Sequence, residues 1–217
     1  MEKERRIKVL SLVALIIAVL GLTVAFAALS ETLTINGTAS VDAASWDIHF
    51  ENLESNVTGD ASITDEPVIN ETTISNINMT ITKPNDSVTF LASIKNAGTI
   101  DAKISSIKVS DLCTLQSSVE SCDWDNDGEV TQNDINKVND NISFIVAYND
   151  DGKALKENDT LNVGEEKEIT FGLVFAKFTE IDGFYNVENS YFEATELPKR
   201  DLQFNDLSIM INYVQAD

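Results

Sequence analysis

A run of acidic and amide residues near the middle of the chain has the spacing of a metal-binding loop. Carboxylates occupy its positions 1, 3 and 5, a glycine (Gly128) occupies position 6, and another carboxylate occupies position 12. Calcium prefers six to eight oxygen ligands in a flexible geometry, and this arrangement turns such oxygens inward around one sharp bend. Position 7 offers its backbone carbonyl, and position 9 offers a hydroxyl or a bridging water. The spacing therefore predicts a Ca²⁺ site built by Asp123, Asp125, Asp127, Glu129, Thr131 and Asp134.

The alternative interpretation is an Asp/Asn/Gly-rich turn on an acidic protein. The last acid of the loop is Asp134, where an EF-hand usually has Glu. This variant resembles the calcium loop of dockerin modules, including the apolar residue that follows, Ile135. Ile135 and Val138 have helical spacing and predict a short helix leaving the loop, within 133–139. The sequence holds no second loop of this kind, so this loop is either half of an EF-hand pair or a solitary site. For a solitary extracellular site we expect an affinity of about 10⁻⁴–10⁻³ M and a structural role.

Two cysteines, Cys113 and Cys122, stand directly before this loop. In an exported chain such a pair is expected to form one disulfide, which would brace the loop by closing a small ring. The chain-entropy argument gives a stabilisation of about 2–3 kcal/mol. A pair of free thiols or soft-metal ligands is the alternative.

The residues that most enzymes depend on are scarce. The chain has one histidine, His49, which lies on the polar side of an alternating run and is expected at the surface. The motifs His-Glu-x-x-His, Gly-x-Ser-x-Gly and Gly-x-Gly-x-x-Gly do not occur, and neither does a phosphate-binding loop. We therefore assign no catalytic residue and expect no enzymatic activity. A hydrolase that uses carboxylates alone is a weaker alternative, because nothing singles out a pair of acids.

Charge and the N-terminal segment favour an exported protein. The 217 residues include 15 Lys and Arg against 36 Asp and Glu, a net charge of −21, which argues against nucleic acid as a partner. A basic head precedes an uncharged run over 9–29, and Ala25-Phe26-Ala27 is typical of a signal-peptidase site. Residues 1–28 are thus predicted to form a hydrophobic leader helix, either a removed signal peptide or a retained membrane anchor. Both interpretations place the remaining chain outside, secreted or at the cell surface.

The elements that would position these residues are strands. From Leu29 onward, apolar and polar residues alternate with a period of two, which predicts half-buried strands. A change of parity near Ser105-Ser106 indicates a bulge. Residues 51–73 are acidic and rich in Ser, Thr and Asn, and they are predicted to be a long loop. Residues 178–203 have no clear pattern. The predicted strands cover about 29–41, 46–50, 77–81, 88–94, 100–109, 142–148, 169–175 and 207–213.

Short strands with turn residues between them predict an all-β fold. We expect one jelly-roll or Greek-key β-sandwich over 29–217, with the calcium loop inserted at 111–140.

The order of several short motifs resembles the TasA/camelysin family of secreted biofilm-matrix proteins. The first is the small-residue region Ala25-Phe26-Ala27-Ala28-Leu29-Ser30, which runs straight into a predicted strand. The others are Lys83-Pro84-Asn85-Asp86 before the next strand, and Asn96-Ala97-Gly98-Thr99-Ile100-Asp101-Ala102. The resemblance implies a jelly-roll sandwich, export by a dedicated signal peptidase, and assembly into extracellular fibres. In such fibres the mature N-terminal segment completes a neighbour's sheet.

The sequence and the resemblance together predict a calcium-stabilised structural subunit of a surface fibre or biofilm matrix. Its partners would be other copies of itself, joined through residues 29–41, and components of the cell envelope or matrix. Residues 29–41 have the alternation that a donated strand needs, but the same strand could pair within its own subunit. The alternative function is a tethered or secreted binding module, in which aromatic residues at 184–192 engage glycan or protein.

Overall fold

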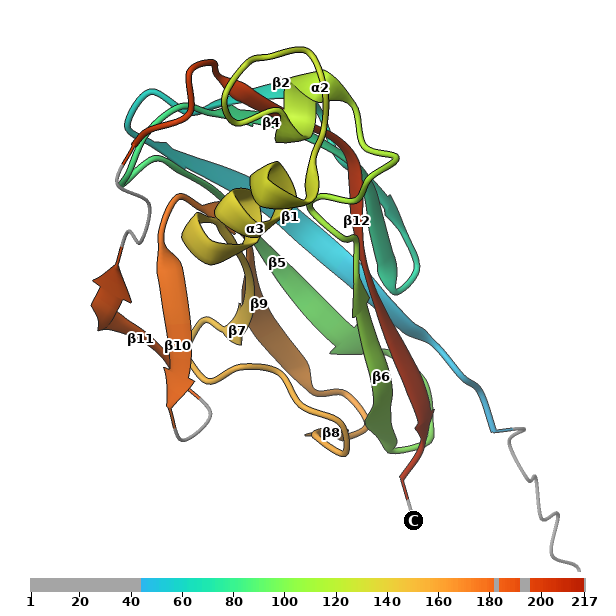
Figure 1. Ribbon diagram of the computed structural model, residues 1–217. Coiled ribbons are helices and arrows are strands. Elements are labelled where there is room, and N and C mark those ends of the chain that lie inside the picture. The colour runs from blue at the N-terminus through green and yellow to red at the C-terminus, as the bar shows by residue number, and fades with distance from the viewer. Residues whose placement is uncertain (1–43, 182–183, 192–195, 217) are drawn as a thin grey trace, which may run out of the picture. The chain divides into compact units, whose positions relative to one another are not determined.

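The structure is a computed structural model that describes residues 44–181, 184–191 and 196–216 (Figure 1). Over 178–181 and 184–191 only the backbone is described. The predicted leader at 1–28 and the predicted strand at 29–41 lie outside these ranges, and so do the side chains of the aromatic residues at 184–192. Among the described residues, no helix has both the length and the apolar character needed to cross a bilayer.

Two antiparallel sheets make up the body of the domain, which confirms the all-β prediction (Figure 1). The first sheet has the order β1 (Ile48–Thr58), β5 (Ser87–Asn96), β9 (Glu166–Val174) and β7 (Ser143–Tyr148). The second has the order β2 (Ser62–Asp65), β4 (Thr73–Ile81), β12 (Leu202–Gln215), β6 (Ala102–Val109) and β8 (Thr160–Leu161), and β3 (Val68–Asn70) also pairs with β4. A separate hairpin consists of β10 (Lys177–Ile181) and β11 (Phe184–Tyr191).

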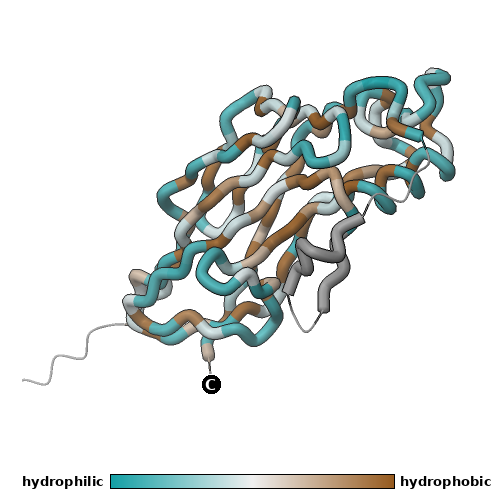
Figure 2. The backbone as a smooth tube through the Cα atoms, turned by 90° about the vertical axis from the view of Figure 1, so that its left-hand side faces the viewer, coloured by the Kyte–Doolittle hydropathy of each residue, from teal (hydrophilic) through white to brown (hydrophobic). Residues whose placement is uncertain are grey.

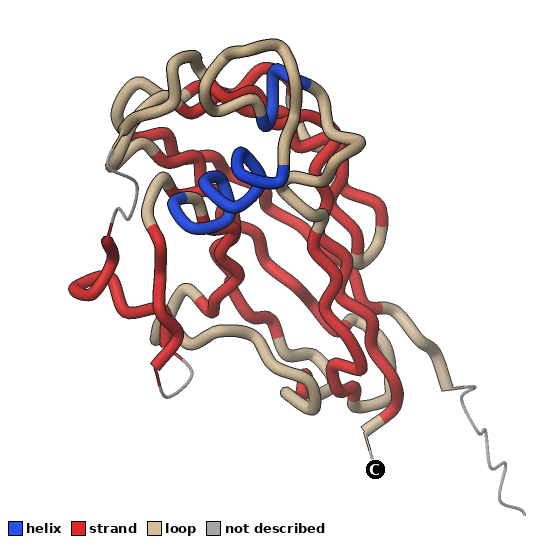
Figure 3. The backbone as a smooth tube through the Cα atoms, viewed as in Figure 1, coloured by secondary structure: helices blue, strands red, loops and turns tan. Residues whose placement is uncertain are grey.

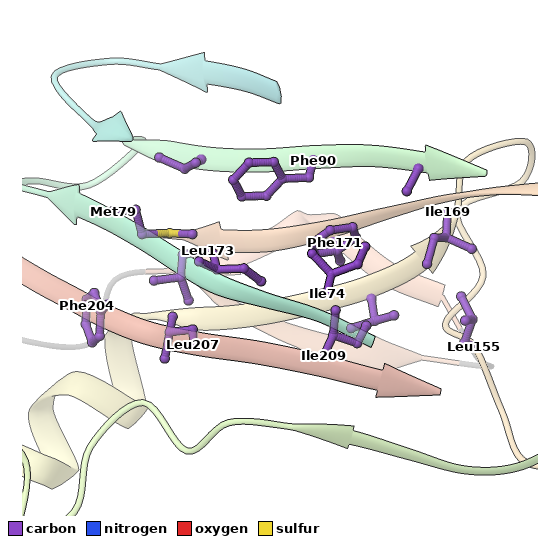
Figure 4. Packing of buried hydrophobic residues seen from close by; sticks show 14 of the residues in the cluster. Ile74, Met79, Phe90, Leu155, Ile169, Phe171, Leu173, Phe204, Leu207 and Ile209 are labelled. Atoms are coloured by element: carbon purple, nitrogen blue, oxygen red, sulfur yellow. The ribbon is translucent and has the colours of Figure 1, made fainter. Parts of the chain in front are cut away.

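The core lies between the two sheets and is built from the alternating apolar residues of the central strands. Phe90 of β5 and Phe171 of β9 stack with their ring centroids 5.4 Å apart. Ile74, Met79 and Ile209 of the second sheet are completely buried in the same cluster (Figure 4). Burial of each such side chain contributes about 1.5–3 kcal/mol relative to an exposed one. Figure 2 shows the same division along the chain, with hydrophobic stretches along the strands and hydrophilic connections between them.

Several strands are bent by bulges at residues that tolerate a left-handed backbone. The register shifts at Asn52 in β1 and at Asp206 in β12, where φ is 58° and 56°. Short polar side chains accept this conformation more readily than other non-glycine residues. In β6, Ser106 pairs with Asn212 and Ile104 pairs with Tyr213, so the intervening Ser105 has no opposite residue. The bulge predicted at this point is therefore confirmed.

The prediction of a long loop over 51–73 is wrong. β1 continues to Thr58, and β2 and β3 follow before β4 begins at Thr73. β1 is an edge strand of its sheet, and residues 54–58 are exposed. Here the strand pairs through its backbone and neither face is covered by other elements, so no apolar side chains are needed. The alternation of apolar and polar residues that marks a half-buried strand is therefore absent. In the segment 178–203, which had no clear pattern, the structure places most of β10, all of β11 and the start of β12.

The connection between β6 and β7 carries the helices of the described chain, α2 (Val119–Cys122) and α3 (Gln132–Asn141). It packs beside the first residues of β12, where the Ser121 hydroxyl donates to the Gln203 carbonyl at 2.7 Å. The other ends of β6 and β12 hold the points where the chain enters and leaves the domain. There the Ser45 N–H donates to the Thr99 hydroxyl, and the Ala216 N–H donates to the Asp101 carbonyl. The connection that carries the helices (blue in Figure 3) thus lies at one end of these two strands, and Ser45 and Ala216 lie at the other end.

Candidate metal centre

A disulfide and a short helix fix the start of the acidic loop. Cys113 and Cys122 are bonded, with their Cα atoms 5.8 Å apart, which confirms the predicted disulfide. Cys122 ends α2, whose first turn is capped by Ser118 through a bond from the Ser121 N–H at 3.3 Å. Asp123 follows directly as the residue that caps the end of this helix. The first acidic residue of the loop is therefore attached to a segment that a disulfide and a capped helix hold in place.

Asp123 organises the turn with both of its carboxylate oxygens. Its side chain is fully buried, and it accepts the N–H of Asp127 at 3.2 Å and the N–H of Gly128 at 2.9 Å. The turn requires a left-handed backbone at Asn126 and at Gly128, where φ is 56° and 93°. Glycine adopts such a conformation without strain, which is the physical reason for its place at position 6.

Asp134 closes the loop from the first turn of α3. The N–H of Thr131 donates to Asp134 Oδ2 at 2.9 Å, and the Asp134 N–H donates to the Thr131 hydroxyl at 3.4 Å. This reciprocal capping box satisfies two backbone donors at the start of the helix. The Thr131 hydroxyl also donates to the same carboxylate oxygen. One oxygen of Asp134 thus serves the helix, and the other is left for a different partner.

Three carboxylates converge at this point. Asp123, Asp125 and Asp134 each place one oxygen within 4.8 Å of the oxygens of the other two. Two oxygens that each lie 2.3–2.6 Å from one calcium ion are at most about 5 Å apart, so the observed spacing fits a shared cation. Oδ1 of Asp125 and Oδ1 of Asp134 are buried and accept no hydrogen bond from the described part of the chain. A buried carboxylate oxygen without a partner is costly, and a bound cation removes that cost. The cluster can therefore hold a metal ion.

The pKa of Asp134 favours the charged form that a cation requires. Burial disfavours ionisation of this carboxyl group, because the residue as a whole is only 1% exposed. The hydrogen bonds from the Thr131 hydroxyl and from backbone N–H groups outweigh the burial and lower its pKa below the ordinary value. The group is therefore ionised at neutral pH.

The remaining predicted ligands are not part of this carboxylate cluster. Asp127 is exposed, and its Oδ1 accepts the N–H of Glu129 at 3.0 Å. The Glu129 side chain is exposed as well, and the prediction for this residue concerned its backbone carbonyl. The Thr131 hydroxyl is bonded to Asp134. Ligation by these three residues remains a prediction.

The structure adds two residues that sequence reasoning did not select. Trp124 is 1% exposed and stacks on Phe175, with ring centroids 6.1 Å apart and an angle of 12° between the planes. Its indole N–H donates to the Glu196 carbonyl at 3.3 Å, and its own carbonyl accepts the N–H of Lys199 at 2.9 Å. Arg200 comes next in the chain, and its Nη1 lies 4.0 Å from Asp123 Oδ2. The aromatic residue inside a polar loop was a visible signal for Trp124, but no local pattern marks Arg200.

Comparison of the chain with models of protein families, with curated proteins and with solved structures gives no match in any of the three.

Proposed function

We propose that this protein is an exported structural subunit of an extracellular fibre or matrix, and that its acidic cluster binds Ca²⁺ as a structural ion. The observation that carries the metal proposal is the buried, unpartnered Oδ1 of Asp134, a residue that places one carboxylate oxygen within 4.8 Å of oxygens of Asp123 and Asp125.

The chemistry of the donors favours calcium. The cluster consists of carboxylate oxygens alone, which suit a hard cation, and both cysteines of the chain are engaged in the disulfide. Magnesium demands an almost regular octahedron with ligands at 2.0–2.1 Å, whereas calcium accepts looser and more numerous oxygens. Backbone carbonyls of the loop and water would supply the remaining ligands. No catalytic step is part of the proposal.

The position of the cluster favours a structural role for the ion. Asp123 is adjacent to the disulfide, and Asp134 belongs to α3, so an ion held by both would tie the two parts of the connection together. Trp124, between the first two acids, packs on Phe175 at the end of β9. Metal binding would therefore fix the connection onto the end of the sandwich. The disulfide also supports export, because such bonds persist in oxidising compartments.

The edge of the second sheet supports assembly through strand addition. β8 pairs with β6 only at Ala102 and Lys103, so the outer edge of β6 from Ser105 to Val109 has no paired strand among the described residues. Such an edge accepts an extended segment through main-chain hydrogen bonds, with pockets for alternate side chains. The alternating residues 29–41 are the donor that the resemblance to the TasA/camelysin family suggests. They precede the point at which the chain enters the domain, close to the start of β6.

Terbium luminescence provides a direct test of the metal proposal. Tb³⁺ replaces Ca²⁺ at oxygen sites, and the indole of Trp124 within the loop would sensitise its emission. We expect saturable emission that excess Ca²⁺ displaces, and its loss in Asp134→Asn. Asp111→Asn is the matched control, because Asp111 is an exposed acid of the same connection. Emission that survives in Asp134→Asn would show that the ion binds elsewhere.

Deletion of residues 29–41 tests assembly and separates the two fates of that strand. If the segment is donated, deletion abolishes fibres in electron micrographs and leaves the melting temperature of the monomer unchanged. If the segment pairs within its own subunit, deletion lowers the melting temperature instead. A full chain that stays a monodisperse monomer and binds a glycan or peptide saturably would favour the alternative function, a binding module.

A further inference from the structure

Arg200 stands beside the carboxylate cluster in a position that the proposed calcium loop does not require. Its Nη1 lies 4.0 Å from Asp123 Oδ2, and no other basic side chain of the described chain comes as close to Asp123, Asp125 or Asp134. The Nε of Arg200 is buried and has no hydrogen-bond acceptor among the described residues. A guanidinium normally donates hydrogen bonds from all its N–H groups. The carboxylate cluster does not provide acceptors for all of them, although it lies beside this side chain.

Main-chain hydrogen bonds, and not the interaction of its side chain with Asp123, hold Arg200 beside the cluster. The preceding residue, Lys199, donates its N–H to the Trp124 carbonyl at 2.9 Å. The Trp124 indole donates to the Glu196 carbonyl at 3.3 Å, so the segment that ends in Arg200 is attached to the loop at two points. Substitution of the Arg200 side chain should therefore leave its backbone in place.

We propose that Arg200 is a built-in counter-ion of the metal centre and sets its affinity. The inference rests on the proposed function, since it concerns the same site. When the site is empty, the guanidinium offsets part of the repulsion among the three carboxylates and keeps the loop folded. When Ca²⁺ enters, its double positive charge meets the fixed charge of Arg200, which is only partly exposed, at 27%. Partly buried charges are weakly screened, so this repulsion weakens binding.

The consequence is a site that is preformed but of low affinity. Without Arg200, the acids would repel one another more strongly in the empty loop and attract calcium more strongly. Arg200 therefore lowers the affinity for calcium and stabilises the metal-free loop. A low affinity is sufficient for an ion that is abundant outside the cell.

Calorimetric titration of the purified protein with CaCl₂ tests this inference. For Arg200→Gln we expect about ten-fold tighter calcium binding, a lower melting temperature in chelator, and a larger rise of the melting temperature on adding calcium. Arg200→Lys keeps the charge and should bind calcium like the wild type. Lys199→Gln is the matched control: it removes the same charge from the adjacent exposed residue and should change the affinity less than about two-fold.

The outcomes separate this inference from the proposed function. Calcium binding by the wild type with an equal affinity in Arg200→Gln and Lys199→Gln would overturn the role of Arg200 alone. Weaker binding by Arg200→Gln would overturn it as well, because the side chain would then be positioning Asp123 for the ion. Absence of calcium binding in the wild type and in every variant would refute the calcium site of the proposed function, and the inference with it.

Discussion

Removal of calcium should lower the thermal stability of the protein by a measurable amount. A ligand that binds only the folded state stabilises it by RT ln(1 + [L]/Kd). With about 10 mM calcium and an affinity of about 10⁻⁴–10⁻³ M, the stabilisation is about 1.4–2.7 kcal/mol. For a chain of this length, each kcal/mol shifts the melting temperature by about 2–4 °C, so we expect a rise of about 3–11 °C.

Asp134→Asn is the sharpest perturbation of this effect. The amide oxygen can still accept the Thr131 N–H that caps α3, so the helix start is preserved. The substitution removes the negative charge and places the amide NH₂ group where the unpartnered Oδ1 of Asp134 lies in the wild type. We therefore expect little change of the melting temperature in chelator and loss of the rise with calcium. The melt is followed by circular dichroism in chelator and in calcium, and Asp111→Asn should keep the full response of the wild type.

Two results would refute this reasoning. One is a wild-type melting temperature that is the same in chelator and in calcium, because the ion would then have no linkage to folding. The other is an undiminished response of Asp134→Asn, because the stabilising ion would then bind without the carboxylate whose Oδ1 has no partner among the described residues.

Three further predictions concern the disulfide, a buried carboxylate and two tyrosines of the sandwich. Replacement of Cys113 and Cys122 by serine should lower the free energy of unfolding by about 2–3 kcal/mol in urea titrations, whereas an unchanged midpoint would show that the bridge does not constrain the unfolded chain. Asp86 is fully buried and accepts hydrogen bonds from three backbone N–H groups. Asp86→Ala should therefore lower the free energy of unfolding by about 3 kcal/mol or more, and Asp86→Asn should lower it clearly less. Burial raises the pKa of Tyr148 and Tyr213 above the ordinary value of 10.0. The unfolded chain therefore loses these protons at a lower pH than the folded chain does, so the free energy of unfolding should fall as the pH rises above 10. Tyr213→Phe should make that fall shallower in melts at increasing pH, and an equal slope would contradict a raised pKa for Tyr213.

The strands that could be predicted from the sequence are those with one covered face. In β5 and β9 every second side chain enters the core, so the alternation predicts the strand directly. The exposed half of β1, together with β2 and β3, forms through backbone pairing at sheet edges, where side chains carry no period. Edge strands are therefore the part of this fold that the pattern of apolar residues cannot reveal.

The candidate site likewise contains residues that could be predicted, because they are close in the sequence, and residues that could not, because they come from distant segments. Asp123, Asp125 and Asp134 could be predicted because the loop that carries them bends back within twelve positions. The disulfide is local for the same reason. Arg200 and Phe175 come from distant segments, and only the packing of the insertion on the sandwich brings them to the loop.

Two of the motifs that suggested a family resemblance have direct structural roles in this fold. The amide of Asn96 is buried, donates to the carbonyls of Ile100 and Leu161, and accepts the N–H of Gly98. A Cβ on Gly98 would lie 2.6 Å from the Ser45 carbonyl oxygen, so the close passage of the chain that enters β1 requires glycine.

Asp86 has a comparable function at the other motif, where it binds the turn over 82–86 to the turn that carries Gly59. A Cβ on that glycine would lie 2.2 Å from Asp86 Oδ1. Both motifs thus lock turns of a sandwich, and any protein with the same turns would need similar residues. Their presence argues for the fold. The proposed function is supported instead by the two carboxylate oxygens without a partner, Oδ1 of Asp125 and Oδ1 of Asp134, and by the edge of β6 that no described strand pairs with.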